Sequence, residues 1–223
     1  MNILIVGFQR SGTTLLRRLI QLHPQVSCVF HERFLIKICK DKKHILQYAK
    51  THGVNVEKDN WGEKVPYYPS ARKYPIVTYC EKWEEYFGDD SRILHIVRHP
   101  YDIALSTVKK FKNIKTVDHP LKLYKRIIPR SVKNIGNLRT SYTFKYEDLL
   151  LNPDEMMAGI YKYCGLDPDF DFHKKMKMTP NPRYQKIDSS RSLAYKNKGV
   201  NFDCDLQEII EPLNFIGKTK YEL

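Results

Sequence analysis

Long apolar runs are missing from this sequence of 223 residues. None approaches the roughly 20 residues that a membrane-spanning helix needs. Only Asn2 separates Met1 from the first apolar segment, at 3–6, which leaves no space for a cleavable signal or an anchor. The sequence therefore predicts a cytoplasmic protein, or a soluble fragment of a longer one, without a membrane span.

Cysteine is sparse, and the cysteines are scattered without any C-x-x-C pair or His/Cys cluster. We therefore expect neither a disulfide framework nor a structural zinc site, and no metal ligands are predicted. Internal repeats, low-complexity segments and an obvious linker are absent too, so residues 1–223 are expected to form a single domain. The cysteines, interpreted as free thiols in a reducing compartment, are Cys28, Cys39, Cys80, Cys164 and Cys204.

Acidic residues are outnumbered, because 25 Asp and Glu face 38 Lys and Arg, which gives a formal net charge of +13. A basic surface attracts anions such as nucleic acid, acidic glycans, lipid head groups or a phosphorylated nucleotide. No recognised nucleic-acid-binding module accompanies this charge, so nucleic acid is not a predicted partner. We expect most of the charge, including the clusters at 109–112 and 173–177, to lie on solvated surface.

The stretch 3–16, ILIVGFQRSGTTLL, combines a strand signal with a helix signal. Residues 3–6 are apolar without polar alternation, which is typical of a buried parallel strand. Leucine and isoleucine then recur at helical spacing after Gly12. A strand, a turn of small residues and a helix form a phosphate cradle, because backbone N–H groups converge at the positive end of the helix.

The details of this turn separate it from a nucleotide-hydrolysing P-loop, whose pattern is G-x-x-x-x-G-K-[ST]. Gly7 and Gly12 have the required spacing, but Thr13 stands where that loop has its lysine, and the cation is Arg10. QRSGTTLL instead resembles the 5′-phosphosulfate loop of the sulfotransferases that use 3′-phosphoadenosine 5′-phosphosulfate (PAPS). The resemblance implies that the donor is bound by Arg10, Ser11, Gly12, Thr13, Thr14 and Leu15.

A second segment, 92–106, reads RILHIVRHPYDIALS and is again an apolar strand followed by a helix. It is similar to the 3′-phosphate motif of that family, in which an Arg at the strand end and a Ser eight residues later hold the phosphate. Arg98 and Ser106 have this spacing, and the planar guanidinium of Arg98 suits a phosphate. The alternative for Arg98 is a structural ion pair with Asp102, one helical turn away.

A third segment, NWGEKVPYY at 60–68, resembles a Lys-Thr-Pro-x-Tyr element of carbohydrate and tyrosylprotein sulfotransferases, the Arg-type branch of the family. Lys64 matches the lysine, which approaches the leaving phosphate of the donor in that branch. Val65 departs from the commoner threonine.

The block 142–166 contains YEDL and resembles a scaffold element of the family, so that the resemblance extends over most of residues 1–166. Further on, the polar loop 188–199 is located where family members close over the 3′-phosphate. Arg191 is the predicted donor contact in this loop.

Sulfuryl transfer needs the acceptor oxygen, the sulfur and the leaving phosphate in line, and a charge that stabilises the departing oxygen. Arg10 and Lys64 are the candidates for that charge, and no metal is required. Arg10 acts by charge and hydrogen bonds alone, because an arginine does not release a proton at neutral pH. Lys64 is the better candidate for protonating the leaving phosphate.

The acceptor hydroxyl needs a base as it attacks. VFHERF, at 29–34, follows the second strand signal, and in the Arg-type branch a Glu at this point takes the acceptor proton. Glu32 is the matching residue, whereas a shift of the alignment by one residue selects His31. A third interpretation leaves Glu32 in a structural ion pair with Arg33 or a nearby lysine.

Apolar strands alternate with helical segments, which predicts an α/β fold with a parallel central sheet. The resemblance implies a P-loop-like, three-layer fold in which helices flank this sheet. Strands are predicted near 2–6, 26–30, 93–97 and 142–146. Helices are predicted near 12–22, 33–50, 79–87, 101–111, 120–138 and 153–164, with a kink or a break at Pro129.

The sequence thus predicts an enzyme that transfers a sulfuryl group from PAPS to an acceptor hydroxyl and releases adenosine 3′,5′-bisphosphate (PAP). Aromatic and basic residues in 33–60, 65–80 and 109–130 favour a glycan or glycolipid acceptor, although aromatic residues also build cores. These aromatic residues are Phe34, Tyr48, Trp61, Tyr67, Tyr68, Phe111 and Tyr124. The alternatives are a P-loop nucleotide kinase and a non-catalytic relative that binds an anion or a glycan. The sequence does not indicate an oligomeric state.

Overall fold

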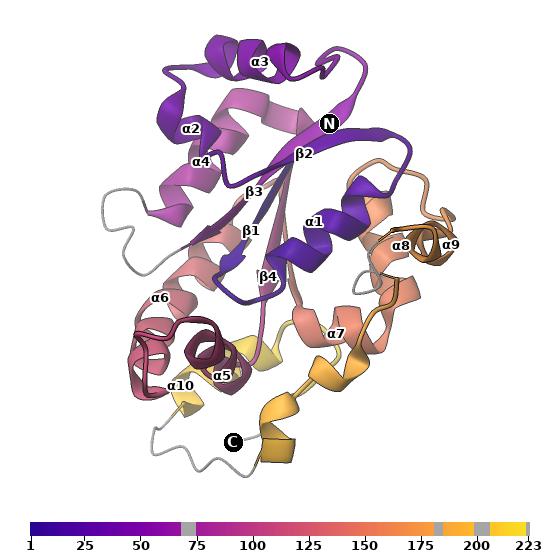
Figure 1. Ribbon diagram of the computed structural model, residues 1–223. Helices are drawn as coiled ribbons and strands as arrows, with labels where there is room; N and C mark the ends of the chain where they lie inside the picture. Colours follow the sequence, from indigo (N-terminus) through magenta and orange to yellow (C-terminus); the bar gives the residue numbers. More distant parts are fainter. Residues whose placement is uncertain (68–74, 181–184, 199–205, 222–223) are drawn as a thin grey trace.

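The computed structural model describes residues 1–67, 75–180, 185–198 and 206–221. Its centre is a five-stranded sheet in the order β2-β3-β1-β4-β5, in which neighbouring strands are parallel (Figure 1). The strands are β1 (Asn2–Phe8), β2 (Val26–His31), β3 (Asn60–Tyr67), β4 (Ser91–Val97) and β5 (Ser141–Lys145). The predicted α/β fold with a parallel central sheet is therefore confirmed.

The side chains of β1 alternate between two hydrophobic clusters, one on each face of the sheet. Ile3 and Ile5 belong to one cluster, and Leu4 and Val6 belong to the other. All four side chains are buried. The strand is apolar throughout because helices cover both of its faces.

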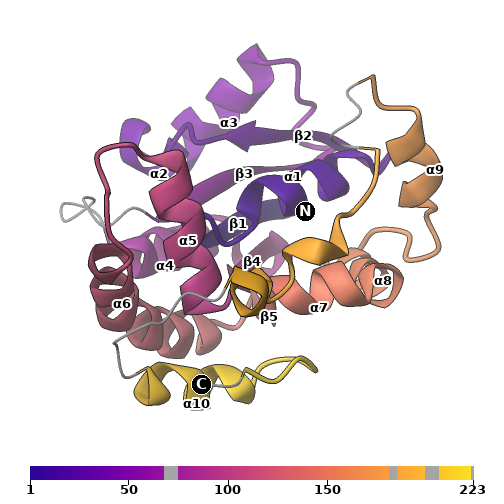
Figure 2. The same ribbon diagram turned by 60° about the horizontal axis from the view of Figure 1, so that its bottom comes forward.

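Two groups of helices complete the three layers. The cluster around Ile3 is covered by α1 (Thr13–Gln21), α7 (Tyr146–Leu151), α8 (Pro153–Tyr163) and α9 (Phe172–Lys177). The cluster around Leu4 is covered by α2 (Leu35–Ile38), α3 (Lys42–Thr51), α4 (Ile76–Phe87), α5 (Pro100–Lys110), α6 (Asp118–Gly136) and α10 (Gln207–Asn214). Figure 2 shows α10 alongside α6. Among the helices of the described segments, none is long and apolar enough to cross a membrane.

One strand, β3, was not predicted. Its sequence NWGEKVPY shows no alternation and contains Gly, Glu, Lys and Pro, which are uncommon in strands. It nevertheless pairs with both β1 and β2, and Glu63 and Lys64 are buried within it. Gly62 is suited to this position because a Cβ there would collide with the backbone of Ile3 on β1. Pairing with neighbouring strands therefore overrides the weak local preference.

The helix predicted at 33–50 is in fact two helices. Cys39 has an extended backbone, with φ −95° and ψ 141°, and this ends α2. Asp41 then caps α3 by accepting a hydrogen bond from the N–H of His44 at 3.0 Å. Of the kink or break predicted at Pro129, the break does not occur: α6 is continuous from Asp118 to Gly136, with Pro129 inside it.

The acidic residues of the YEDL block hold other parts of the chain together. Glu147 and Asp148 are buried at the start of α7. Glu147 accepts hydrogen bonds from the N–H of His99 at 3.0 Å and from the hydroxyl of Tyr221 at 2.6 Å. Asp148 accepts one from the N–H of Lys218 at 2.9 Å. The end of β4 and the segment after α10 are thereby fastened to α7.

Asp148→Asn should lower the free energy of unfolding by about 1.5–3 kcal/mol, the range for a hydrogen bond to a charged group. The carboxylate accepts from the N–H groups of both Lys218 and Thr219, whereas an amide offers one acceptor oxygen. Urea unfolding followed by circular dichroism measures the change. Lys218→Ala is the control, because it removes an exposed ion pair with Glu155 that should contribute less than about 1 kcal/mol. Equal losses in the two variants would contradict this role of Asp148.

Candidate active site

The turn between β1 and α1 is a cradle of backbone N–H groups. Arg10 and Gly12 both have positive φ, 72° and 104°, and the N–H of Ser11 donates to the carbonyl of Phe8 at 3.0 Å. No side chain of the described residues caps α1, whose N-cap is Gly12. The N–H groups of its first turn are therefore available to an anion.

Two glycines make this turn possible. A Cβ at Gly7 would lie 2.6 Å from the carbonyl oxygen of Ile96. A Cβ at Gly12 would collide with the ring of Tyr146, which packs directly on the turn. The close packing of β1, β4 and α7 thus explains the glycines at both ends of the motif.

A cavity of about 670 Å³ opens beside the turn. Its walls are the start of α1, one face of α5 and the segment 186–194. Eight of the predicted donor-binding residues line it: Arg10, Gly12, Thr13, Thr14, Leu15, Arg98, Ser106 and Arg191. Ser11, the remaining one, is buried within the turn.

Two buried polar atoms at this turn lack a hydrogen-bond partner within the described segments, namely Nε of Arg98 and Oγ of Ser11. An unpartnered buried polar group is costly, so such groups are uncommon unless a ligand or water satisfies them. Both atoms can donate a hydrogen bond, which is what the oxygens of a phosphate or sulfate accept.

Three of the arginines that line the cavity are those predicted to bind the donor, Arg10, Arg98 and Arg191. Arg10 donates from Nε to Oγ of Ser106 at 2.9 Å. Arg98 donates to the carbonyl of Arg10 at 3.2 Å and to the carbonyl of Arg191 at 3.1 Å. Burial, together with the charge of Arg98, lowers the pKa of Arg10. A bound anion would relieve this repulsion.

The ion pair between Arg98 and Asp102 is present as well, with nitrogen and oxygen 3.5 Å apart. Asp102 is buried and also accepts from the N–H groups of Ala194 and Tyr195, at 3.2 and 2.9 Å. Burial raises the pKa of Asp102. Because the pair leaves Nε of Arg98 without a partner in the described segments, it does not exclude phosphate binding.

Of the candidate catalytic residues, Arg10 lines this cavity. The other three lie outside its wall: Lys64 within β3, and His31 and Glu32 at the end of β2. Nζ of Lys64, on β3, contacts Oε1 of Glu32, and the N–H of Glu32 donates to the carbonyl of Lys64 at 2.9 Å. Nε2 of His31 lies 3.7 Å from the same carboxylate. The alternative in which Glu32 pairs with a nearby lysine is therefore observed, with Lys64 as that lysine.

Burial changes the pKa of Lys64 and of His31. It lowers the pKa of Lys64, whose side chain is 2% exposed, against the opposing influence of Glu32. Burial and the charge of Lys64 lower the pKa of His31. A lysine with a lowered pKa gives up a proton more readily, and His31 is kept in its neutral form at neutral pH.

The strand order brings both groups to one edge of the sheet. At the carboxyl edge, β2 leads into Glu32, β1 into the phosphate turn, β4 into Arg98 and β5 into Tyr146. Lys64 lies within β3, opposite His31 at the end of β2. Ligands of open α/β sheets bind outside this edge. A molecule held by Arg98 at one end and by the turn in its middle would therefore direct its other end toward Lys64 and Glu32.

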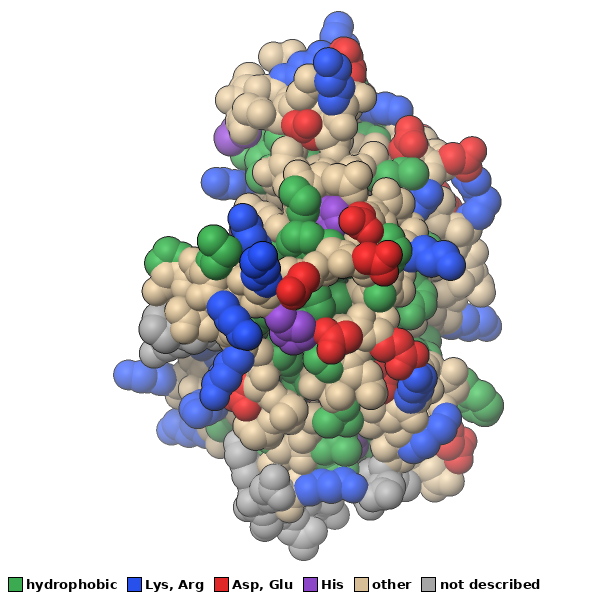
Figure 3. Space-filling model, turned by 90° about the vertical axis from the view of Figure 1, so that its right-hand side faces the viewer, with side chains coloured by type: hydrophobic (Ala, Val, Ile, Leu, Met, Phe, Trp, Pro, Cys, Tyr) green, Lys and Arg blue, Asp and Glu red, His purple; other side chains and the backbone are tan. Residues whose placement is uncertain are grey.

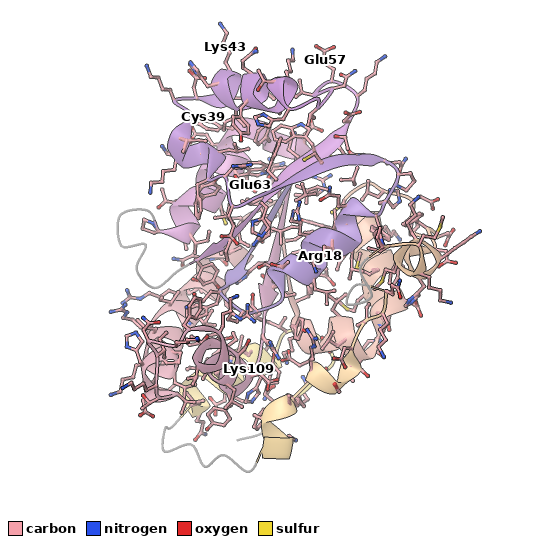
Figure 4. All side chains as sticks on the ribbon, in the orientation of Figure 1. Arg18, Cys39, Lys43, Glu57, Glu63 and Lys109 are labelled. Carbon is pink, nitrogen blue, oxygen red and sulfur yellow. The ribbon has the colours of Figure 1, made fainter. Side chains whose placement is uncertain are left out.

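The structure adds basic residues that were not predicted to line the cavity: Arg18, Lys109 and Lys186. Figure 4 shows Arg18 on α1 and Lys109 on α5. Helical spacing could have identified two of them, because Arg18 lies one turn after Thr14 and Lys109 lies three residues after Ser106.

The described part of the chain contains no group of three His, Cys, Asp or Glu that could hold a metal.

The expectation that aromatic side chains line an acceptor pocket is wrong for Trp61, Tyr67 and Tyr124, because all three are buried in the core. Tyr68 lies outside the described residues.

On the face shown in Figure 3, Lys and Arg lie at the top and along both flanks, and most visible acidic side chains lie near the middle. The basic charge on this face is therefore spread widely.

Comparison with known proteins agrees with this geometry. No curated protein matches the chain. Its fold is similar to the sulfotransferase domain from the curacin biosynthetic pathway, with 17% identity and a TM-score of 0.63 over 96% of this chain and 95% of that one. The sulfotransferase domain of the Synechococcus PCC 7002 olefin synthase gives 19% identity and a TM-score of 0.64, covering 93% and 91%.

Mouse sulfotransferase SULT7A1, complexed with PAP, has 19% identity and a TM-score of 0.53 over 91% of this chain and 76% of that one. At these identities the likeness establishes the fold. The sequence itself matches the model of the sulfotransferase family over residues 2–74 and 84–171, which together make up most of the chain. With this match, the predicted family is confirmed, and the chain belongs to the sulfotransferase family.

Proposed function

We propose that this enzyme transfers the sulfuryl group of PAPS to an acceptor hydroxyl by in-line displacement. The observation that carries the proposal is a cavity lined by four arginines at the uncapped start of α1, with the Lys64–Glu32 pair on the neighbouring strands. PAP bound to the mouse sulfotransferase supports a donor of this class. A nucleotide kinase, the alternative, has a lysine where this chain has Thr13.

The residues fit the donor as follows. Arg98, Ser106 and Arg191 would hold the 3′-phosphate, because all three line the cavity to which the segment 186–194 also contributes. Ser11 and the N–H groups that begin α1 would hold the 5′-phosphosulfate, because no side chain of the described residues caps this helix.

The reaction forms a bond between the acceptor oxygen and sulfur and breaks the bond between sulfur and the bridging oxygen. The bonding electrons remain on the bridging oxygen, which leaves as part of the PAP phosphate. Glu32 takes the hydroxyl proton, and Lys64 and Arg10 stabilise the charge that develops on the leaving phosphate. The lowered pKa of Lys64 also suits it to donate a proton there.

The acceptor in this proposal is a glycan or glycolipid hydroxyl, and the enzyme acts in the cytoplasm. Three aromatic side chains remain to support such an acceptor, namely the partly buried Phe34, Tyr48 and Phe111. Their rings could stack on a sugar face. A screen with labelled PAPS over glycans, lipids, phenols and peptides would identify the acceptor.

Arg98→Ala should weaken PAP binding by about 1.5–3 kcal/mol, because it removes hydrogen bonds to a charged phosphate. Calorimetry in EDTA measures the affinity of PAP and that of AMP, which lacks the 3′-phosphate. The affinity of AMP should change far less. Arg139→Ala, which removes an exposed arginine paired with Asp89, is the control and should leave both affinities unchanged. Equal losses for PAP and AMP would remove Arg98 from the 3′-phosphate site.

A further inference from the structure

Glu63 is a fully buried carboxylate next to Lys64 on β3, and no step of the mechanism uses it. Successive side chains of a strand point to opposite faces of the sheet. The neighbours Trp61 and Val65 pack in the cluster around Leu4, which places Glu63 on that face, and Lys64 on the face of α1. Figure 4 shows Glu63 where the sheet meets α2.

The carboxylate of Glu63 binds the chain just after the candidate base. It accepts hydrogen bonds from the N–H of Phe34 and, at 3.0 Å, from the N–H of Leu35. The hydroxyl of Tyr79, on α4, donates to it at 2.6 Å and accepts from the N–H of Ile36 at 3.0 Å. Glu63 and Tyr79 thus hold three consecutive backbone N–H groups.

This segment needs such restraint because its backbone is strained. Glu32 and Phe34 both have positive φ, 55° and 57°, although neither is glycine. A non-glycine residue in this region is strained and persists only where its surroundings impose the conformation. On one side the carbonyl of Lys64 holds the N–H of Glu32 at 2.9 Å, and on the other side Glu63 holds the residues that follow.

We propose that Glu63 is a positioning residue that, through the backbone of residues 34–36, fixes Glu32 in the orientation from which it takes the acceptor proton. Glu63 acts through the backbone, because it lies on the opposite face of the sheet from Lys64 and its carboxylate is engaged by the N–H groups of Phe34 and Leu35. The inference rests on the proposed function for the role of Glu32.

The test is a double-mutant cycle at pH 8 with Glu63→Gln and Glu32→Gln, measured as kcat for the acceptor and as the affinity of PAP. Glutamine accepts through one oxygen and therefore cannot bind both the Phe34 and the Leu35 N–H groups. In the wild-type background, Glu63→Gln should lower kcat by about 10–100-fold, because a displacement of about 1 Å can cost on the order of 10²-fold. PAP affinity should stay within about two-fold, since the donor cavity is not touched.

In the Glu32→Gln background, Glu63→Gln should lower kcat by less than about two-fold, because two residues that act through one group are not additive. Equal losses of kcat in both backgrounds, or a parallel loss of PAP affinity, would overturn the proposal.

Should Glu63→Gln not fold, Glu63→Asp keeps the charge but shortens the side chain, and the same cycle applies. Tyr79→Phe removes the contact to the Ile36 N–H and the hydroxyl that donates to Glu63, but it leaves both Glu63–backbone contacts in place. It should therefore lower kcat less than Glu63→Gln does.

Transfer by the wild-type enzyme tests the proposed function on its own. If the wild-type enzyme transfers the sulfuryl group but Glu63→Gln lowers kcat equally in both backgrounds, only the role of Glu63 is contradicted and the proposed function stands.

Discussion

Glu32→Gln is expected to lower kcat by about 10²–10⁴-fold, the usual contribution of general-base catalysis. Glutamine keeps the size of the side chain and can still contact Lys64, but it cannot accept the proton of the acceptor. The affinity for PAP should remain within about two-fold, because Glu32 lies outside the wall of the donor cavity. Single-turnover assays with labelled PAPS give the rate, and calorimetry gives the affinity.

His31→Asn is the matched control, because Nε2 of His31 lies 3.7 Å from the Glu32 carboxylate. The lowered pKa of His31 keeps the ring neutral at neutral pH, so that it is able to accept a proton and is a true competitor. We expect His31→Asn to retain most of the transfer activity. Near-full activity in Glu32→Gln, together with loss in His31→Asn, would assign the base to His31.

The residues that line the candidate donor cavity could be predicted from the sequence because each motif is local. The turn that contains Gly12 needs only one strand and one helix, and Arg98 and Ser106 lie on a single strand–helix unit. The hydrogen bond from Arg10 to Ser106 could not be predicted, because 96 residues separate the two side chains. Only the pairing of β1 with β4 brings these units together.

The acceptor half depends on contacts that no local pattern indicates. Lys64 reaches Glu32 because β3 pairs with β2 in a register that sets His31 opposite Lys64. The sequence of β3 does not indicate a strand, so neither this register nor the role of Glu63 could be predicted. Trp61 also lies on β3, and it was expected to contact the acceptor because the sequence does not show that this segment is a buried strand. An aromatic residue in a segment of unknown structure suits a core and a cleft equally well.

Lys64→Met should lower kcat by about 10²–10³-fold, as expected when one donor to a developing oxyanion is removed. Methionine has a similar length and no charge, which suits the buried position of Lys64. Because the charge that Lys64 would stabilise appears mainly in the transition state, the affinity for PAP should change by less than about three-fold. The same transfer assay and calorimetry measure both quantities.

Lys64 also contacts Glu32, so the double variant Glu32→Gln/Lys64→Met is needed to separate its two possible roles. If Lys64 acts on the leaving phosphate, Lys64→Met should still lower kcat in the Glu32→Gln background, by a factor that differs from its loss in the wild type because the two side chains are in contact. If Lys64 only holds Glu32 in place, Lys64→Met should cost nothing further once the carboxylate is gone. We expect the further loss, in contrast to the pattern for Glu63, its neighbour on β3. No further loss in that background would leave the stabilisation of the leaving phosphate to Arg10.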